Sequence, residues 1–313
     1  MSSTLPEGSQ QTAQSVAATL AMLGLVIFAW GGNYTWIKIA LRDVGPWTFN
    51  AARYCGAASV IGVVLVLHGG PHTALPVRGE RWGLAVIGLL PGAVLTVLIT
   101  VSLLWIESTR TILLIYTNPV WTLLLSRMLL GERLTPFNVT GVVVGLAGII
   151  LLTNPWALPW QASTLPGIVA AVAGSIAWAL GSVLYRRRRW RSTFWQQVFW
   201  QLAASGRVTA IAAVLLERDV MVTLTPPLLL IVLYNVLIPT ALAFWCWSQA
   251  LTRVSPSIAS QALLLSPVFG VAQSHFVLGE PLHAAMLASA AAVLVGTALT
   301  FVRAPSGRGE AGR

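Results

Sequence analysis

Residues 118–134 read Asn-Pro-Val-Trp-Thr-Leu-Leu-Leu-Ser-Arg-Met-Leu-Leu-Gly-Glu-Arg-Leu, and residues 266–282 read Ser-Pro-Val-Phe-Gly-Val-Ala-Gln-Ser-His-Phe-Val-Leu-Gly-Glu-Pro-Leu. The two stretches align without a gap, at an offset of 148 residues (266 minus 118). The offset also matches four pairs elsewhere in the chain: Trp30 with Trp178, Lys38 with Arg186, Pro91 with Pro239 and Gly148 with Gly296. One register over nearly the whole length predicts a structural unit that occurs twice.

The composition indicates a membrane protein. Of the 313 residues, 56% are hydrophobic and only 9% are charged, and the mean hydropathy is +0.78. Soluble chains typically carry about 25% charged residues. Because roughly 20 apolar residues cross the hydrocarbon core of a bilayer, we expect an all-α integral membrane fold with ten transmembrane helices. They fall at about 16–38, 46–68, 82–106, 110–130, 135–153, 165–186, 194–217, 226–252, 255–279 and 282–302.

Little sequence remains outside these segments. The longest connections, near 69–81 and 154–164, are too short to fold a soluble catalytic domain, and no Gly-x-x-x-x-Gly-Lys-Ser/Thr loop for ATP occurs. The first apolar run is too long for a signal peptide and is expected to be retained. Cys55 and Cys246 both fall in apolar segments, where a thiol behaves as a small hydrophobe. We therefore expect no disulfide, no metal site, no cofactor and no enzymatic activity.

The distribution of basic residues predicts the orientation. With a cytoplasmic N-terminus, that side carries Arg78, Arg81, Arg127, Arg133, Arg186, Arg187, Arg188, Arg189, Arg191, Arg253, Arg303, Arg308 and Arg313, against Lys38, Arg42, Arg110 and Arg218 opposite. The positive-inside rule then favours both termini in the cytoplasm of a bacterial-type inner membrane. This anchoring, together with contact to anionic lipid, accounts for the net charge of +10. A nucleic-acid partner is not expected, and a monomer is compatible with the sequence.

Five helices in each unit is an odd number, so the second unit must enter the membrane upside down. We predict one five-helix repeat at 16–153 and a second, inverted one at 165–302, around a central cavity. Inverted repeats of this kind are typical of secondary transporters that work by alternating access. Nothing in the sequence resembles the carboxylate rings or carbonyl filter of a channel.

Prolines and glycines punctuate the repeats at matched positions. Pro91 and Pro239 fall within the third and eighth segments, and Pro119 and Pro267 within the fourth and ninth. Each removes a backbone hydrogen bond and bends its helix, either as a static kink or as a bend beside the cavity that changes during transport. The motifs Gly131-Glu132 and Gly279-Glu280 are expected to end one helix and to meet the amide-rich start of the next.

These features resemble the drug/metabolite transporter superfamily. The resemblance rests on three features: Phe-Ala-Trp-Gly-Gly-Asn-Tyr at 28–34, Ile-Ala-Trp-Ala-Leu-Gly-Ser at 176–182, and the two Pro…Leu-Gly-Glu-x-Leu stretches. More narrowly, the chain is similar over about residues 16–302 to the ten-helix EamA-type exporters, and its 14 tryptophans suggest the YddG group of aromatic amino acid exporters. The resemblance implies a basket in which the first, third, fourth, sixth, eighth and ninth helices surround the cavity.

The candidate site has aromatic walls and neutral hydrogen-bonding groups. On the first helix, Trp30, Asn33 and Tyr34 share a face at i, i+3 and i+4, and Trp178 begins a matched face on the sixth. The expected substrate-binding residues are Trp30, Asn33, Tyr34, Thr100, Tyr116, Asn118, Trp178, Tyr234, Asn235, Trp245, Gln261 and Ser266. The alternative role of any single tryptophan is packing or the membrane-interface belt.

No carboxylate lies in the middle of an expected helix, so transport is not expected to require a titrating group there. Arg53 and Arg207 do enter the segments, but on the second and seventh helices, where lipid or interhelical contact explains them. We predict export of amino acids, aromatic and other neutral ones, across the inner membrane. The alternatives are a multidrug or quaternary-ammonium exporter and, less favoured because the cavity helices lack basic residues at mid-depth, a nucleotide-sugar or sugar-phosphate exchanger.

Overall fold

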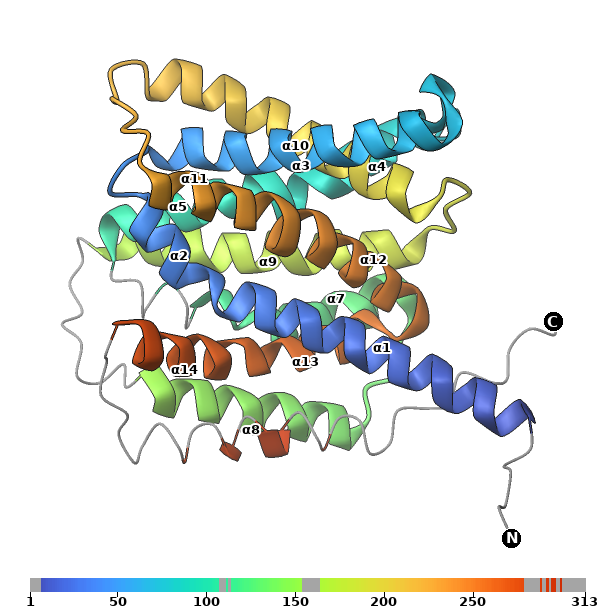
Figure 1. Ribbon diagram of the computed structural model, residues 1–313. Coiled ribbons are helices and arrows are strands. Elements are labelled where there is room, and N and C mark those ends of the chain that lie inside the picture. The colour runs from blue at the N-terminus through green and yellow to red at the C-terminus, as the bar shows by residue number, and fades with distance from the viewer. Residues whose placement is uncertain are drawn as a thin grey trace, which may run out of the picture.

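The computed structural model describes residues 7–106, 111, 114–153 and 164–278, together with 288, 291–292, 294–296 and 299. Every regular element in these ranges is a helix, which confirms the all-α prediction (Figure 1). The last expected segment, 282–302, lies almost entirely outside them, as do the motif Gly279-Glu280 and the ends of the chain.

In the first half of the chain, the described residues form five successive helical segments. They are α1 (Glu7–Gly31) with α2 (Asn33–Ala40); α3 (Pro46–Gly69), followed by the short η1 (Pro71–Ala74); α4 (Arg81–Leu89), η2 (Leu90–Val94) and α5 (Leu95–Trp105); α7 (Asn118–Leu130); and α8 (Pro136–Thr153). The first segment is interrupted at Gly32, a break that the continuous apolar pattern did not predict.

The second half follows the same order as far as it is described. Its helices are α9 (Leu165–Arg187), α10 (Phe194–Leu216), α11 (Pro226–Asn235) with η5 (Val236–Leu242) and α12 (Ala243–Arg253), then α13 (Pro256–Ala262) with η6 (Leu263–Leu265) and α14 (Ser266–Leu278). Across the described residues, five helices are long and apolar enough to cross a membrane: Pro46–Gly69, Arg81–Ser102, Leu165–Arg187, Phe194–Leu216 and Pro226–Arg253. Val16–Gly31 and Pro136–Leu151 are shorter apolar helices.

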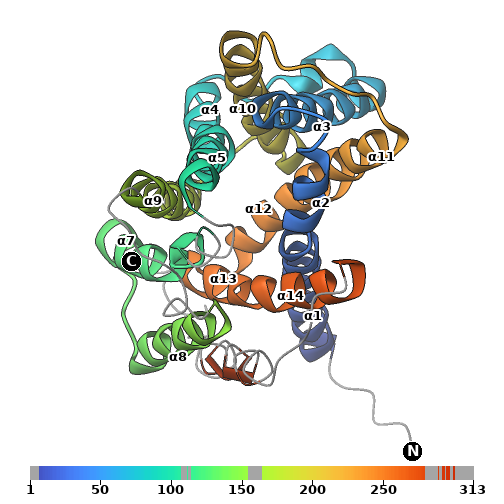
Figure 2. The ribbon, with the colours of Figure 1, turned by 90° about the vertical axis from the view of Figure 1, so that its left-hand side faces the viewer.

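The helical segments lie lengthwise beside one another, and the described turns after α3, α7, α9 and α12 bring the chain back in the opposite direction (Figures 1 and 2). As a result α1 and α9, which occupy corresponding places in the two halves, run in opposite directions (Figure 1). Their contacts also correspond: α1 packs against α12 and α14, and α9 packs against α5 and α7. The pair α3 and α10 forms the most extensive contact between the halves.

Irregular helix geometry surrounds the four repeat-matched prolines. Pro91 and Pro239 lie in the π-helical segments η2 and η5, where the hydrogen-bond pattern widens from i, i+4 to i, i+5. Pro119 lies in the first turn of α7, and Pro267 follows the 3₁₀ turn η6 at the start of α14. All four prolines therefore mark places where the regular backbone ladder is interrupted.

Side chains of neighbouring helices donate to the carbonyls at these interruptions. The Ser175 hydroxyl of α9 donates to the Ile115 carbonyl, four residues before Pro119, at 2.9 Å. The Ser205 hydroxyl of α10 donates to the Gly88 carbonyl, three residues before Pro91, at 3.0 Å. An unsatisfied carbonyl costs several kcal/mol in lipid, so these bonds tie each broken helix to its neighbour.

Two carboxylates join neighbouring helices at the two ends of the bundle. The Glu217 carboxylate, just after α10, accepts the backbone N–H groups of Trp47 and Thr48 at the start of α3, both at 2.8 Å. At the opposite end, Glu80 accepts the N–H groups of Arg191 (2.7 Å) and Ser192 (3.0 Å) and the Ser192 hydroxyl. Burial alone would raise the pKa of Glu80, but these hydrogen bonds and the Arg188 charge together hold it below its usual value.

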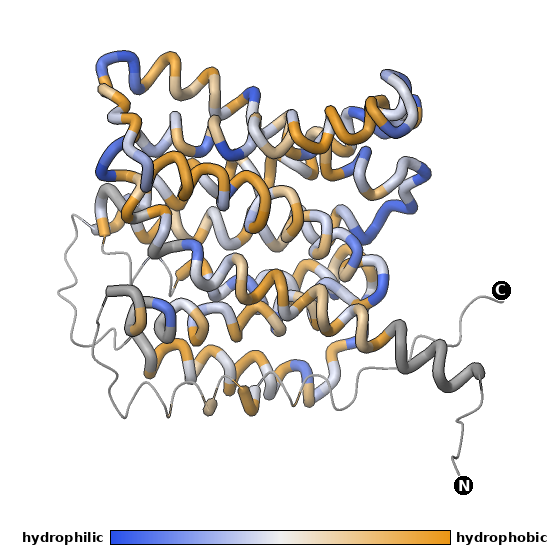
Figure 3. Tube along the Cα trace, viewed as in Figure 1, coloured by the Kyte–Doolittle hydropathy of each residue, from blue (hydrophilic) through white to orange (hydrophobic). Residues whose placement is uncertain are grey.

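Polar residues gather at the ends of the bundle, and apolar residues cover its length (Figure 3). Basic side chains are unequally divided between the ends. The end where α1 begins also holds Arg78, Arg81, Arg127, Arg133, Arg186, Arg187, Arg188, Arg189, Arg191 and Arg253. We call it the arginine-rich end.

The connection between α7 and α8 lies at the arginine-rich end. Gly131 ends α7 in the left-handed conformation with φ of 70°, as the sequence predicts. The prediction that Glu132 meets the start of the next helix is wrong. Thr135 and Asn138 cap the start of α8. Glu132 instead accepts a hydrogen bond from Ser257 at the start of α13. Local periodicity gives no signal for a contact between residues this far apart in the chain.

Substitution of Gly31 tests whether α1 packs closely against the start of α14. A Cβ atom at this position would overlap the backbone carbonyl of Ser266, which a side-chain adjustment does not relieve. We expect Gly31→Ala to destabilise the protein by about 1–3 kcal/mol, the usual range for overpacking. The matched control is Gly24→Ala on the same helix, where a Cβ atom meets nothing within 4 Å. Equal thermal unfolding midpoints of the two variants in detergent would contradict the packing.

Candidate substrate site

Four aromatic side chains meet where the two halves of the chain join. Trp30, near the end of α1, lies edge-on to Trp178 of α9 with ring centroids 4.9 Å apart. Phe244 and Trp247 of α12 each lie 5.7 Å from Trp30, and Trp247 lies 5.4 Å from Trp178. We call these four residues the aromatic cluster. The two repeat-matched tryptophans, Trp30 and Trp178, are thus in direct edge-to-face contact.

Trp30 is fixed by both packing and hydrogen bonding. Its indole Nε1–H donates to the Pro239 carbonyl in the π-helical segment η5, at 2.8 Å. Edge-to-face aromatic pairs contribute about 0.5–1.5 kcal/mol beyond the area that they bury. The contact therefore joins the end of α1 to the irregular part of the eighth segment.

Unlike the Trp30 indole, the Trp178 indole makes no hydrogen bond within the described structure. Its side chain is 6% exposed, and its indole N–H has no partner within the described structure. A buried donor without a partner costs about 1–3 kcal/mol, so such groups in native proteins call for an explanation. The aromatic cluster thus contains a buried donor that no described residue satisfies.

Acceptors without partners are buried on the helices around the cluster. The Oδ1 atoms of Asn33, Asn118 and Asn235 lack a partner among the described residues, although these side chains are 6%, 4% and 0% exposed. Three further buried groups lack a hydrogen-bond partner among the described residues: the Ser266 hydroxyl, the Thr240 hydroxyl and the Trp245 indole N–H. Donors and acceptors without partners therefore both occur among the described residues of the two halves.

The structure does not gather all of the expected residues at the cluster. Thr100 is half-buried on α5, and Gln261 is fully buried in α13. Tyr116 packs in a separate group with Ile149 and Leu264, and Tyr234 packs edge-on against Trp36 with centroids 6.4 Å apart. Trp245 packs at the edge of the cluster and stacks on Trp195 at 5.2 Å. The side chain of Tyr34 lies outside the described residues.

Phe244 and Trp247 are the cluster members that sequence reasoning missed. A regular helix advances 100° per residue, so a face that begins at Tyr234 would continue at Trp245. The segment η5 between them is π-helical and takes an extra residue per turn, which rotates the rest of the segment. Pro239 was the available signal for an irregularity here, but it does not predict the size of the rotation.

The two intramembrane arginines lie away from the cluster, on the scaffold pair α3 and α10. The Arg53 guanidinium lies 4.7 Å from the centre of the Tyr54 ring and donates to the Tyr54 hydroxyl at 3.2 Å. Arg207 is exposed on α10. Neither side chain supplies a charge to the aromatic cluster.

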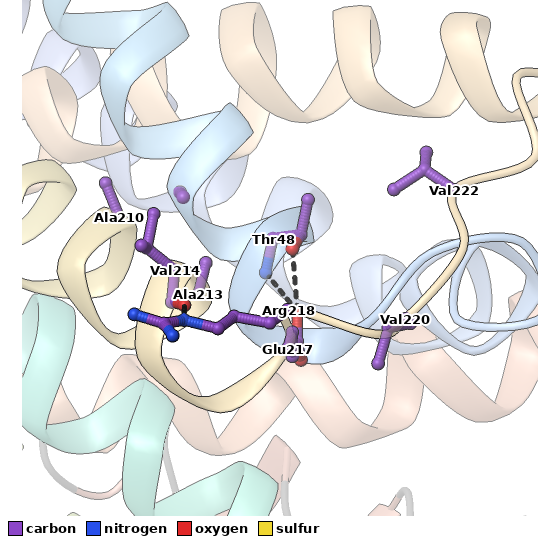
Figure 4. Close-up of a pocket in the computed structure, with 9 residues that line it drawn as sticks. Thr48, Ala210, Ala213, Val214, Glu217, Arg218, Val220 and Val222 are labelled. Atoms are coloured by element: carbon purple, nitrogen blue, oxygen red, sulfur yellow. Dashed lines mark hydrogen bonds between the residues drawn. The ribbon is translucent and has the colours of Figure 1, made fainter.

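A pocket of about 490 Å³ lies at the end of the scaffold pair, opposite the arginine-rich end (Figure 4). Its lining residues are Thr48, Ala51, Ala210, Ala213, Val214, Glu217, Arg218, Val220 and Val222. The Glu217 carboxylate is already occupied by the start of α3, and Arg218 donates to the Val214 carbonyl at 3.0 Å. Its polar groups therefore serve the scaffold. Within the described ranges, no group of three His, Cys, Asp or Glu side chains is arranged to hold a metal ion.

Comparison with known proteins identifies the same architecture elsewhere. The sequence profile of the EamA-like transporter family matches residues 17–154 and again residues 165–302. A crystal structure with a TM-score of 0.78 covers 92% of this chain and 97% of its own, at 22% sequence identity. That likeness shows the fold alone.

Two curated relatives cover most of the chain. The Escherichia coli K12 protein named "Uncharacterized inner membrane transporter YedA" is 30% identical over 257 residues, which are 80% of this chain and 79% of that protein. The Bacillus subtilis protein named "Uncharacterized transporter YoaV" is 24% identical over 263 residues, 81% of this chain and 88% of that protein. Both names describe transporters and neither gives a substrate.

The contrast between the two repeat-matched tryptophans can be measured. Trp30→Phe removes the donor to Pro239, whereas Trp178→Phe removes an indole N–H that has no partner. A hydrogen bond between membrane helices contributes about 0.6 kcal/mol and up to roughly 2, so Trp30→Phe should lower the unfolding free energy more than Trp178→Phe does. Equal losses in denaturation of the purified protein would show that the Trp30 bond does not hold η5.

Proposed function

This chain belongs to the EamA-like transporter family, and from that premise we propose that it exports neutral amino acids, aromatic ones included, by alternating access. Membrane transport and a multi-pass inner-membrane location come with the family and its relatives. The substrate class, the direction and the orientation are our proposal. The aromatic cluster, with the unused polar atoms around it, is the observation that carries the proposal.

The chemistry of these groups suits a zwitterion with an apolar side chain. Unpartnered donors such as the Trp178 indole match a carboxylate, and unpartnered acceptors such as the Asn33 and Asn118 amide oxygens match an ammonium group. The rings of Trp30 and Trp247 supply stacking area for an aromatic side chain. Opening the contact between Trp30 and Trp178 would make room for such a substrate.

The arrangement of the halves supports alternating access. We propose that 16–153 and 165–302 are inverted five-helix repeats around a central cavity, because α1 and α9 run oppositely and make corresponding contacts. Two such halves can exchange conformations, which yields an inward-open and an outward-open state from one fold. The aromatic cluster, formed by α1, α9 and α12, would then be reached alternately from the two sides.

A quaternary-ammonium exporter is the second candidate, since tryptophan faces also attract cations. It predicts selectivity for positive charge rather than for a zwitterion. A nucleotide-sugar or sugar-phosphate exchanger is less well supported, because the aromatic cluster contains no basic side chain to meet a phosphate.

Counterflow of labelled amino acids into proteoliposomes tests the proposal. Phenylalanine and other neutral amino acids should exchange, whereas sugar phosphates and quaternary ammonium compounds should not compete. Asn33→Ala should weaken substrate binding about 3- to 30-fold, the equivalent of one lost hydrogen bond within the membrane. Trp178→Ala should reduce the preference for aromatic over small substrates, because stacking area is lost.

Trp82→Ala is the matched control, since Trp82 on α4 is 85% exposed and lies outside the cluster. Counterflow of a quaternary ammonium compound, without counterflow of any amino acid, would replace the proposal by the second candidate. Unchanged binding and selectivity in both cluster variants would place the site elsewhere.

The orientation is tested separately by labelling a single cysteine. We propose that the arginine-rich end is cytoplasmic. Arg189 is exposed and suits a reporter, whereas its neighbour Ser192 is 6% exposed and bonded to Glu80. In a background with Cys55 and Cys246 replaced, Arg189→Cys should resist an impermeant thiol reagent in intact cells and react after permeabilisation. Labelling in intact cells would reverse the orientation.

A further inference from the structure

A side-chain contact joins the fourth and ninth segments at the arginine-rich end, apart from the Glu80 contacts described above. The Glu132 carboxylate, in the connection between α7 and α8, accepts the hydroxyl of Ser257 at the start of α13, at 2.8 Å. These residues are 125 positions apart and belong to different halves of the chain. The contact therefore bridges the fourth and ninth segments at their ends.

Arg186 brings two further helices to the same place. Its Nη1 atom, at the end of α9, donates to the carbonyls of Thr252 (2.6 Å) and Leu251 (3.1 Å) at the end of α12. Burial raises the pKa of Glu132, while the Ser257 hydroxyl and the positive charge of Arg186 favour its ionised form. The Glu132 carboxylate, the Ser257 hydroxyl and the Arg186 guanidinium therefore lie where the ends of α7, α9, α12 and α13 meet.

Ser257 is not needed to cap its own helix. That role belongs to Ser255, whose side chain accepts the N–H of Ile258 at 3.3 Å. The Ser257 hydroxyl, two residues later, points instead to the other half of the chain. Its contact with Glu132 therefore has no local function that would explain it.

The Glu132 contact also differs in kind from those of the other two end carboxylates. Glu80 and Glu217 each accept backbone N–H groups of a following or neighbouring helix start, together with a hydroxyl. Glu132 accepts one side-chain hydroxyl. Multiple bonds to backbone groups favour a permanent joint, whereas one bond between side chains is broken and remade at small cost.

The repeat register adds a sequence correspondence. An offset of 148 residues relates Glu132 to Glu280, Ser257 to Thr109 and Arg186 to Lys38, which preserves the carboxylate, the hydroxyl and the cation. These three partner side chains lie outside the described residues, so the inference concerns only the described group.

We propose that Glu132 and Ser257, beside the positive charge of Arg186, form an inter-half latch that holds the ends of α7 and α13 together and opens once in each transport cycle. The latch joins the end of α7 to the start of α13, and these two ends separate when the arginine-rich end opens, while the Glu80 joint between α4 and α10 stays closed. It rests on transport by the family and does not depend on which substrate is carried.

Thiol accessibility in proteoliposomes tests the latch without any substrate. Ser260 of α13 is fully buried just beyond Ser257, so Ser260→Cys, with Cys55 and Cys246 replaced, reports opening to a reagent added at the arginine-rich end. Glu132→Ala and Ser257→Ala should each raise the labelling rate about 3- to 30-fold. Glu132→Gln, which keeps an acceptor but not the charge, should give a smaller rise.

Ser255→Ala is the matched control, because it removes a hydroxyl from the same helix start without touching the other half. It should leave the Ser260→Cys labelling rate unchanged. Equal rates in all variants, or an equal rise in the control, would overturn the proposal.

Crosslinking supplies the second arm. In the cysteine-free background, Glu132→Cys with Ser257→Cys should be joined by a short, reducible bifunctional thiol reagent, and counterflow should stop until the link is reduced. Each single-cysteine variant, treated alike, controls for simple modification. Full counterflow through the crosslinked protein would overturn the latch. Absence of amino acid counterflow before crosslinking would instead count against the proposed substrate, and the accessibility result would still decide the latch.

Discussion

Backbone carbonyls released by proline inside a membrane must find donors within the protein, because lipid supplies none. This chain has such breaks at matched places in its halves, and the donors come from neighbouring helices. Ser175 donates to the Ile115 carbonyl, which Pro119 leaves without its usual partner. Ser205 and Trp30 donate to other carbonyls beside the breaks, those of Gly88 and of Pro239 itself. The irregular helices are therefore joined to the opposite half of the chain, which positions α1, α9 and α12 relative to one another.

The aromatic cluster follows from this joining. Once Trp30 is held by Pro239, the edge-on contact with Trp178 places the two halves face to face. The Trp178 indole N–H in the cluster and several other buried polar atoms have no partner among the described residues, which favours a ligand that brings its own donors and acceptors. Beside this centre, Glu217 joins the end of α10 to the start of α3, and Glu80 joins the start of α4 to the connection before α10, each through several hydrogen bonds. Glu132 accepts a single hydroxyl.

Hydropathy and the internal register predicted the all-helical fold, the helical segments that the structure describes, and matched faces at Trp30 and Trp178. They missed the break at Gly32, the rotation that brings Phe244 and Trp247 into the cluster, and every contact of the end carboxylates. The rotation depends on π-helical geometry that Pro239 signals without specifying. The carboxylate contacts join residues more than 100 positions apart, and periodicity along the chain carries no information about them.

The central claim is that substrate binds at the aromatic cluster between the halves. Photo-crosslinking with phenylalanine that carries a diazirine, followed by mass spectrometry of the labelled peptides, tests it most directly. The account predicts adducts within 28–33, 175–182 and 243–247, suppressed by excess phenylalanine. Suppressible adducts confined to 48–51 and 210–222, which line the pocket at the end of the scaffold pair, would contradict it.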